Sequence, residues 1–87
     1  MTEVVMYHTS ACHLCELAEQ MFLEESRQLD GDYTLHRIDI SEHDALFERY
    51  ALVIPVLRFV DGSELGWPFT AAQLRRFIDR SHYSELP

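Results

Sequence analysis

The chain lacks any long hydrophobic run and has few basic residues. No stretch of its 87 residues approaches the length needed to span a bilayer, and its N-terminal end has no basic region followed by a long apolar segment. Seven Lys or Arg residues stand against fifteen Asp or Glu, which gives a net charge of -8 at pH 7. This charge repels phosphate backbones and anionic lipids. We therefore expect a cytoplasmic protein without nucleic-acid or membrane partners.

Cysteine is scarce as well, and Cys12 and Cys15 are separated by only two residues. Small secreted domains that depend on disulfides carry several well-spread cysteines, so this class is a poor explanation. Redox or metal chemistry is the better expectation. A chain of 87 residues is too short for two hydrophobic cores but long enough for one sheet covered by helices. We expect one domain over residues 1–87, acting as a monomer.

The first half of the chain predicts a strand, a helix and a second strand. The apolar run over 3–8 predicts a central strand buried on both faces. Apolar residues at three- and four-residue spacing then predict a helix that begins near Ala11, is capped by Thr9 or Ser10, and ends at Asp30–Gly31. Its expected buried face includes Leu14, Leu17, Ala18, Met21, Phe22 and Leu29, with Glu16, Glu19, Glu24 and Glu25 on the other side. β-branched and aromatic residues over 33–40 predict an outer strand.

The second half predicts a short helix, a hairpin and a final helix. Ser41 and Asp44 resemble a capping box before a helical face that ends near Ala51. Residues 53–57 favour a strand, and Asp61–Gly62 predicts a two-residue hairpin turn.

Thr70 and Gln73 form a second capping box before a helix that buries Leu74, Phe77 and Ile78. The residues from Tyr83 onward indicate a loose tail.

The order of these elements predicts an α/β fold. A strand–helix–strand unit with a right-handed crossover makes the first two strands parallel neighbours, and the hairpin should extend the sheet in the antiparallel sense. The expected architecture is βαβαββα, with a mixed four-stranded sheet flanked by helices.

The two cysteines suggest unequal roles. In a helix that begins near Ala11, Cys12 lies in the first turn, where unpaired N–H groups and the helix dipole favour a thiolate. Cys15 lies one turn inward on the same face, close enough to form a disulfide with little backbone movement. We hypothesise that Cys12 attacks a substrate disulfide and Cys15 resolves the mixed disulfide. His13 would favour the thiolate if protonated, whereas Glu16 opposes it.

Two other interpretations of the pair are open. Free cysteines are often buried as small apolar residues, which would make the pair structural. Alternatively, His8, Cys12, His13 and Cys15 offer two imidazoles and two thiolates, a set that suits zinc or copper. However, His13 points around the helix away from Cys12, and four ligands would converge only if the first turn unwound. We therefore assign no metal ligand.

Taken together, several segments resemble the thioredoxin superfamily, and more closely the small glutaredoxin-like proteins. They are residues 6–16 (MYHTSACHLCE), Tyr50, residues 54–57 (IPVL) and Gly62. The resemblance implies a thioredoxin fold in which a cis Pro55 faces the cysteines and excludes metal from them. It also implies that the backbone of Ile54 is free to pair with an extended peptide or glutathione. Without the resemblance, Pro55 would be interpreted as a trans proline at the start of a strand.

The chain departs from the glutaredoxin pattern at the glutathione site. Glutaredoxins usually carry Pro-Tyr between the cysteines and a Gly-Gly pair before the last helix, where this chain has His13–Leu14 and residues 66–70 (GWPFT). The resemblance therefore carries over the thiol pair and Pro55 but not the glutathione pocket, although N–H groups opening the last helix could bind an anion. We expect Trp67 and Phe69 to pack rather than to recognise a ligand.

The function implied by the resemblance is that of a thiol–disulfide oxidoreductase. Cys12 and Cys15 would act on protein or low-molecular-weight disulfides, with Ile54, Pro55 and His13 contacting the substrate. No bound cofactor is expected, and glutathione enters at most as a co-substrate. Two alternatives stay open: an iron–sulfur or metal carrier using Cys12 from two subunits, and a non-catalytic adaptor that binds a partner around Trp67.

Overall fold

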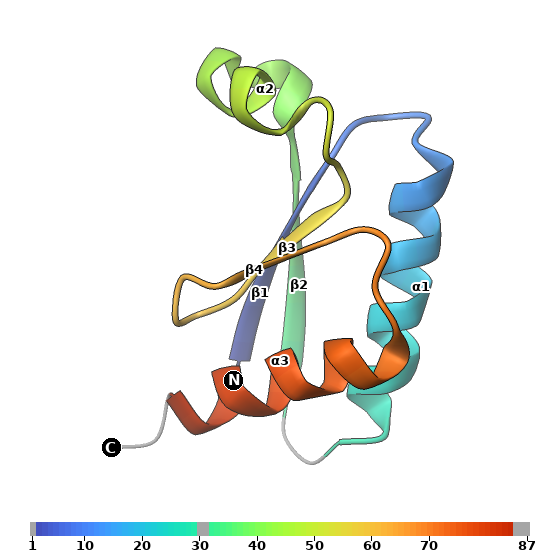
Figure 1. Ribbon diagram of the computed structural model, residues 1–87, viewed down its shortest axis with the longest axis vertical. Helices are drawn as coiled ribbons and strands as arrows, with labels where there is room; N and C mark the ends of the chain where they lie inside the picture. Colours follow the sequence, from blue (N-terminus) through green and yellow to red (C-terminus); the bar gives the residue numbers. More distant parts are fainter. Residues whose placement is uncertain (1, 30–31, 85–87) are drawn as a thin grey trace.

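The computed structural model describes residues 2–29 and 32–84, with side chains up to residue 80. The elements follow the predicted order (Figure 1). They are β1 (Thr2–His8), α1 (His13–Arg27), β2 (Tyr33–Asp39), the short 3-10 helix η1 (Ile40–Glu42), α2 (Asp44–Tyr50), β3 (Val56–Arg58), β4 (Glu64–Gly66) and α3 (Ala71–Ser84). None of the helices in the described part of the chain is long and apolar enough to cross a membrane.

The four strands form one sheet in the order β2-β1-β3-β4. β1 and β2 are parallel and pair along their whole length, from Thr2 opposite Tyr33 to His8 opposite Asp39. β3 is antiparallel to both β1 and β4. The predicted α/β fold with a mixed four-stranded sheet is therefore confirmed, including the parallel first pair and the antiparallel hairpin.

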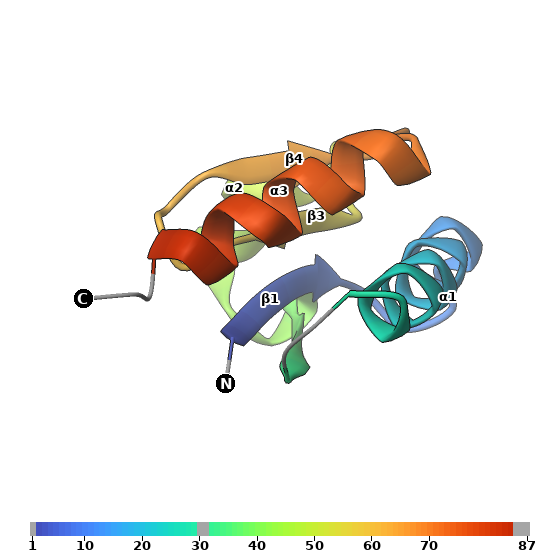
Figure 2. The same cartoon turned by 90° about the horizontal axis from the view of Figure 1, so that it is seen from below.

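The two faces of the sheet are covered differently. In Figure 1, α1 lies along one side of the strands and α2 lies at their upper end, and Figure 2 shows α3 crossing the molecule beside α1. Successive residues of β1 alternate between the faces. One face meets α1 and α3 in what we call the inner core: Val4, Met6, Cys15, Ala18, Phe22, Leu57, Phe59, Leu65, Phe69, Leu74 and Ile78. The other carries the smaller outer cluster: Tyr7, Ile40, Tyr50 and Val56.

Helix α1 differs from its prediction at both ends. It begins at His13, and its N-cap is Cys12 rather than Thr9 or Ser10. The physical reason is Ala11, whose left-handed backbone (φ 58°) breaks the helix that was expected to start there. The last helical residue is Arg27, with Gln28 as the C-cap, and the predicted stop at Asp30–Gly31 lies outside the described residues.

The buried face of α1 is narrower than predicted. Leu14 and Leu17 were expected inside, yet they are 44% and 37% exposed. Ala18 and Phe22 are buried as predicted, and Cys15 and Glu25 complete the buried stripe. Glu25, expected on the solvent side, is buried because the guanidinium of Arg75 in α3 binds its carboxylate (2.5 Å). An ion pair thus joins α1 to α3 far from the cysteines.

Two predicted turns also take other forms. The Ser41–Asp44 capping box is absent because the carboxylate of Asp39 accepts the N–H of Ser41 (2.9 Å) and its hydroxyl (2.7 Å), which forms η1 instead. The hairpin has a three-residue loop: the N–H of Phe59 donates to the carbonyl of Ser63, and Gly62 takes the left-handed conformation (φ 86°).

The start of α3 confirms the second capping box. The N–H of Thr70 donates to the side chain of Gln73 (2.9 Å), and the N–H of Gln73 donates to the hydroxyl of Thr70 (3.1 Å). The helix continues to Ser84, so the tail predicted from Tyr83 starts too early, and residues 85–87 lie outside the described part.

Candidate active site

Cys12 and Cys15 form a disulfide at the point where the chain turns from β1 into α1. Their Cα atoms are 5.2 Å apart. Cys12 has an extended backbone (φ -100°, ψ 103°), and its sulfur accepts the N–H of Cys15 at 3.1 Å. Cys12 is therefore the N-cap rather than a residue of the first turn, but its sulfur still lies at the positive end of the helix dipole.

The two sulfurs differ in their access to solvent. Cys15 is 3% exposed and belongs to the inner core, whereas Cys12 is half-buried at the edge of that core. The unequal exposure expected from their spacing is confirmed. An incoming thiol or disulfide can therefore reach Cys12 more easily than Cys15.

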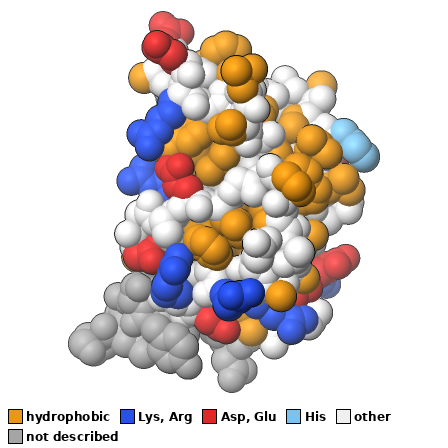
Figure 3. All heavy atoms as spheres, in the orientation of Figure 1, with side chains coloured by type: hydrophobic (Ala, Val, Ile, Leu, Met, Phe, Trp, Pro, Cys, Tyr) orange, Lys and Arg blue, Asp and Glu red, His pale blue; other side chains and the backbone are white. Residues whose placement is uncertain are grey.

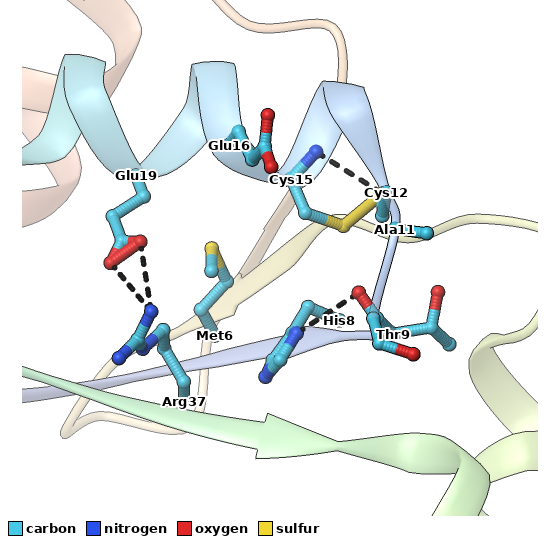
Figure 4. A pocket seen from close by; sticks show the side chains of 10 residues that line it. Met6, His8, Thr9, Ala11, Cys12, Cys15, Glu16, Glu19 and Arg37 are labelled. Carbon is cyan, nitrogen blue, oxygen red and sulfur yellow. Dashed lines mark hydrogen bonds and ion pairs between the residues drawn. A yellow bond between two sulfur atoms is a disulfide. The ribbon is translucent and has the colours of Figure 1, made fainter.

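A cavity of about 160 Å³ opens beside the disulfide, on the side of β2 (Figure 4). Its lining residues come from β1, the loop before α1, α1 itself and β2: Met6, His8, Thr9, Ser10, Ala11, Cys12, Cys15, Glu16, Glu19 and Arg37. Arg37 of β2 reaches across to Glu19 of α1 and forms an ion pair (3.3 Å). Both cysteines and several polar or charged side chains therefore line the same cavity.

Arg37 and Glu19 were not predicted to belong to the site. In the parallel register Arg37 lies opposite Met6 of β1, and paired residues of neighbouring strands face the same way. Arg37 is thereby placed on the face that α1 covers. The alternation of the 33–39 strand, together with its parallel pairing, was the sequence signal that could have found this residue.

His13 is not brought into the cavity. Its ring lies 3.8 Å from the carboxylate of Glu16, and both side chains are largely exposed. His8 lines the cavity, with its Nδ1 3.2 Å from the carbonyl oxygen of Thr9. Within the described residues, no three His, Cys, Asp or Glu side chains are grouped so as to hold a metal ion.

Ile54 and Pro55 precede β3 and lie outside the cavity lining. The Ile54–Pro55 peptide bond is cis, and Pro55 is buried. The N–H of Ile54 donates to the carbonyl of Tyr50 (3.1 Å), and the carbonyl of Pro55 accepts the N–H of Trp67 (3.1 Å). The free Ile54 backbone implied by the resemblance is thus wrong for its N–H, because the end of α2 already uses that group.

The segment before α3 packs against this region. Trp67 is half-buried and meets the ring of buried Phe69 edge-on, with centroids 5.1 Å apart. Phe69 belongs to the inner core and Trp67 packs against it, as expected for packing residues. The Trp67–Pro68 bond is a second cis peptide bond, which no sequence pattern predicted.

Hydrophobic side chains also reach the surface near the start of α1. Leu14, between the two cysteines, is 44% exposed. On the face drawn in Figure 3, hydrophobic side chains gather on the α1 side next to a histidine. The surroundings of the disulfide therefore combine an apolar surface with the charged cavity.

Tyr50, at the end of α2, links the outer cluster to the segment that leads to Pro55. Its hydroxyl donates to Glu64 of β4 (2.6 Å), and its ring stacks on Tyr7 of β1 with centroids 4.3 Å apart. Burial, and then the hydrogen bond to Glu64, raise the pKa of Tyr50 to about 12. The tyrosine is therefore neutral and serves as a hydrogen-bond donor at physiological pH.

Comparisons with known proteins agree with this geometry. The sequence model of the glutaredoxin-like domain (DUF836) matches residues 3–79. The crystal structure of target protein XcR50 from X. campestris is 36% identical, with a TM-score of 0.73 over 88% of this chain and 96% of that chain. The search of curated proteins gave no match.

Two thioredoxins show the same fold at lower identity. Thioredoxin O2 from Arabidopsis thaliana, in its oxidized state, is 21% identical, with a TM-score of 0.64 over 92% of this chain and 74% of that chain. A mutant thioredoxin from Halobacterium salinarum is 23% identical, with a TM-score of 0.65 over 99% of this chain and 77% of that chain. The fold and the Cys12–Cys15 disulfide together support a redox function in general terms.

Proposed function

Since the chain belongs to the glutaredoxin-like domain family, we propose that it is a thiol–disulfide oxidoreductase that works through Cys12 and Cys15. The observation that carries the proposal is the asymmetric disulfide at the start of α1, with Cys12 half-buried at the edge of the core and Cys15 inside it. A helix N-terminus stabilises a thiolate on the exposed sulfur, and a thiolate is the species that exchanges with disulfides.

In the reducing direction, the Cys12 thiolate attacks one sulfur of a substrate disulfide. The substrate S–S bond breaks, one substrate thiolate leaves and takes a proton from water, and the other substrate sulfur stays bound to Cys12. Cys15 then loses its proton to water and attacks the Cys12 sulfur. The Cys12–Cys15 disulfide forms, and the second substrate thiolate leaves and is protonated. The substrate gains two electrons from the two cysteines and two protons through water, one released by Cys15 and one released by Cys12 when it became a thiolate.

The substrate class is a disulfide-containing protein or a small disulfide. We propose that an extended substrate chain contacts the Ile54–Pro55 segment through half-buried Ile54, rather than through the Ile54 N–H or the buried Pro55 ring, and that His13 contacts the chain from the exposed side of α1. An external thiol, with glutathione as one candidate, would regenerate the dithiol. We place the reaction in the reducing cytoplasm, with the protein acting as a monomer and without a bound cofactor.

Single-cysteine variants test the proposal. With a peptide disulfide as substrate, Cys12→Ser should abolish reduction, because no exposed nucleophile is left. Cys15→Ser should accumulate a mixed disulfide on Cys12, detected by mass spectrometry as an added substrate fragment. Equal activity of the wild type and both variants would refute the assignment and leave the adaptor interpretation. Colour or bound metal after anaerobic purification would instead support the carrier interpretation.

A further inference from the structure

We propose that Tyr50 is a positioning residue, which holds the Val53–Pro55 turn in the conformation that a substrate chain binds. The proposal rests on the proposed function, because it assigns a role in the same reaction. It concerns the hydrogen bond between Tyr50 and Glu64, which lies on the opposite face of the sheet from the cavity beside the disulfide.

The backbone of Tyr50 fixes the turn directly. Its carbonyl oxygen accepts two N–H groups, from Val53 at 2.9 Å and from Ile54 at 3.1 Å. Both groups lie just before Pro55, whose own carbonyl is held by Trp67. The turn is therefore fixed at one end by α2 and at the other by the strand pairing of β3 with β4. A shift of Tyr50 would tilt the peptide groups ahead of Pro55.

The side chain of Tyr50 holds the backbone of the same residue in place. The residue is 4% exposed, and its ring stacks on Tyr7 with an interplanar angle of 17°. Its hydroxyl reaches Glu64, which belongs to the strand paired with β3. A buried hydroxyl is costly unless it is hydrogen-bonded, so this contact favours one placement of the ring over nearby ones.

The same ring also connects the turn to the cysteine loop. Tyr7 directly precedes His8, the last residue of β1, and the chain continues from there to Cys12. The stack thus joins the strand that leads to the exposed sulfur and the helix that ends at the turn. Tyr50 touches neither the sulfurs nor the cavity beside them. It should therefore affect how a substrate chain is bound rather than how the sulfurs react.

The experiment compares two substrates in the full chain. One is an extended peptide in mixed disulfide with 2-mercaptoethanol, and the other is bis(2-hydroxyethyl) disulfide, which has no peptide groups. Tyr50→Phe removes only the hydroxyl. It should raise KM for the peptide about three- to tenfold. The value of kcat for the peptide, and KM for the small disulfide, should each change by less than about twofold. Glu64→Ala should raise KM for the peptide in the same way. Glu64→Gln keeps an acceptor for the Tyr50 hydroxyl, so its KM should stay close to the wild-type value.

Arg75→Gln provides the matched control, because it breaks a partly buried contact between α1 and α3 away from the turn. It should lower stability without changing KM for either substrate. Equal effects of Tyr50→Phe on both substrates, or no effect on the peptide, would overturn the proposal.

Amide hydrogen exchange at Ile54 gives a readout that does not depend on activity. Exchange should quicken in Tyr50→Phe but not in Arg75→Gln, and equal protection in both would refute the positioning role. Inactivity of the wild type towards both substrates would refute the proposed function, and with it a role for the turn in that reaction.

Discussion

The two faces of the sheet differ in how completely they are packed. The inner face is closed by α1 and α3 over an apolar core that includes the buried sulfur of Cys15. The outer face is covered at one end by η1 and the short helix α2, and its buried cluster contains two tyrosines. Beyond α2 lies a shallow hollow lined by Glu3, Val5, Tyr7, Arg58, Phe59 and Val60.

This difference separates two tasks. Apolar burial against two helices stabilises the domain and shields the second sulfur from solvent, which needs tight packing but little directional bonding. The outer face has a smaller buried cluster, and directional contacts hold α2 and the Pro55 turn there, among them the hydrogen bond from the Tyr50 hydroxyl to Glu64. The inner face therefore supplies most of the apolar packing that stabilises the fold, and the outer face positions the Pro55 turn.

Neighbouring valines on β1 give the strongest test of this comparison. Val4 is fully buried in the inner core, whereas Val5 is half-buried on the outer face. Val4→Ala should lower the free energy of unfolding by about 2 kcal/mol, because it removes two carbons and leaves a cavity. Val5→Ala should cost about 1 kcal/mol or less, because solvent can fill the space. Urea unfolding of both variants measures the difference, and equal losses would show that the outer face is packed as tightly.

The stability of the protein at high pH tests how much the buried Tyr50 hydroxyl contributes to the outer face. Its pKa is raised from 10.0 to about 12 by burial and by the hydrogen bond to Glu64. The folded state keeps the proton where the unfolded state has lost it, so this contribution is complete below pH 10 and is lost as pH rises towards 12. Between about pH 9 and about pH 11, wild type should lose about 1 kcal/mol more stability than Tyr50→Phe. Parallel losses in urea titrations would remove Tyr50 as the cause.

A substitution of Ala11, at the edge of the inner face, should change the free energy of unfolding least. Its left-handed φ of 58° is unfavourable for an L-residue. Ala11→Gly should relieve this cost but make the unfolded chain more flexible, so the net gain is about 0.5 kcal/mol. The same change at Ala72 in α3 should lower stability instead. Denaturant midpoints compare the two, and a loss at both positions would mean that the conformation of Ala11 is not strained.

Local patterns in the sequence predict most of the fold. The apolar run of β1, the parallel pairing with β2 and the Thr70–Gln73 box depend on residues close in sequence or on a general topological rule. The Asp39 turn could not be predicted in this way, because the Asp39 carboxylate accepts the N–H and the hydroxyl of Ser41, the residue that the pattern had assigned as the cap of the next helix. The burial of Glu25 depends on Arg75, fifty positions away, and no local pattern reveals it.

The candidate site also has features that local sequence patterns predict and features that they do not. The spacing of Cys12 and Cys15 predicts both the disulfide and the deeper position of the second sulfur. The capping role of Cys12 depends on the backbone of Ala11, which propensity does not predict for alanine. The hydrogen bond from Ile54 to Tyr50 depends on how α2 ends. Contacts made by backbone groups at the ends of elements were therefore the least predictable part of the site.

The capping role of the Cys12 sulfur has a consequence for the choice of knock-out. This atom accepts the Cys15 N–H at the first turn of α1, so deleting it removes a structural acceptor together with the nucleophile. A serine hydroxyl is among the best acceptors at a helix N-cap, whereas a methyl group accepts nothing. Replacement by serine thus isolates the loss of reactivity, and replacement by alanine would mix it with fraying of the helix.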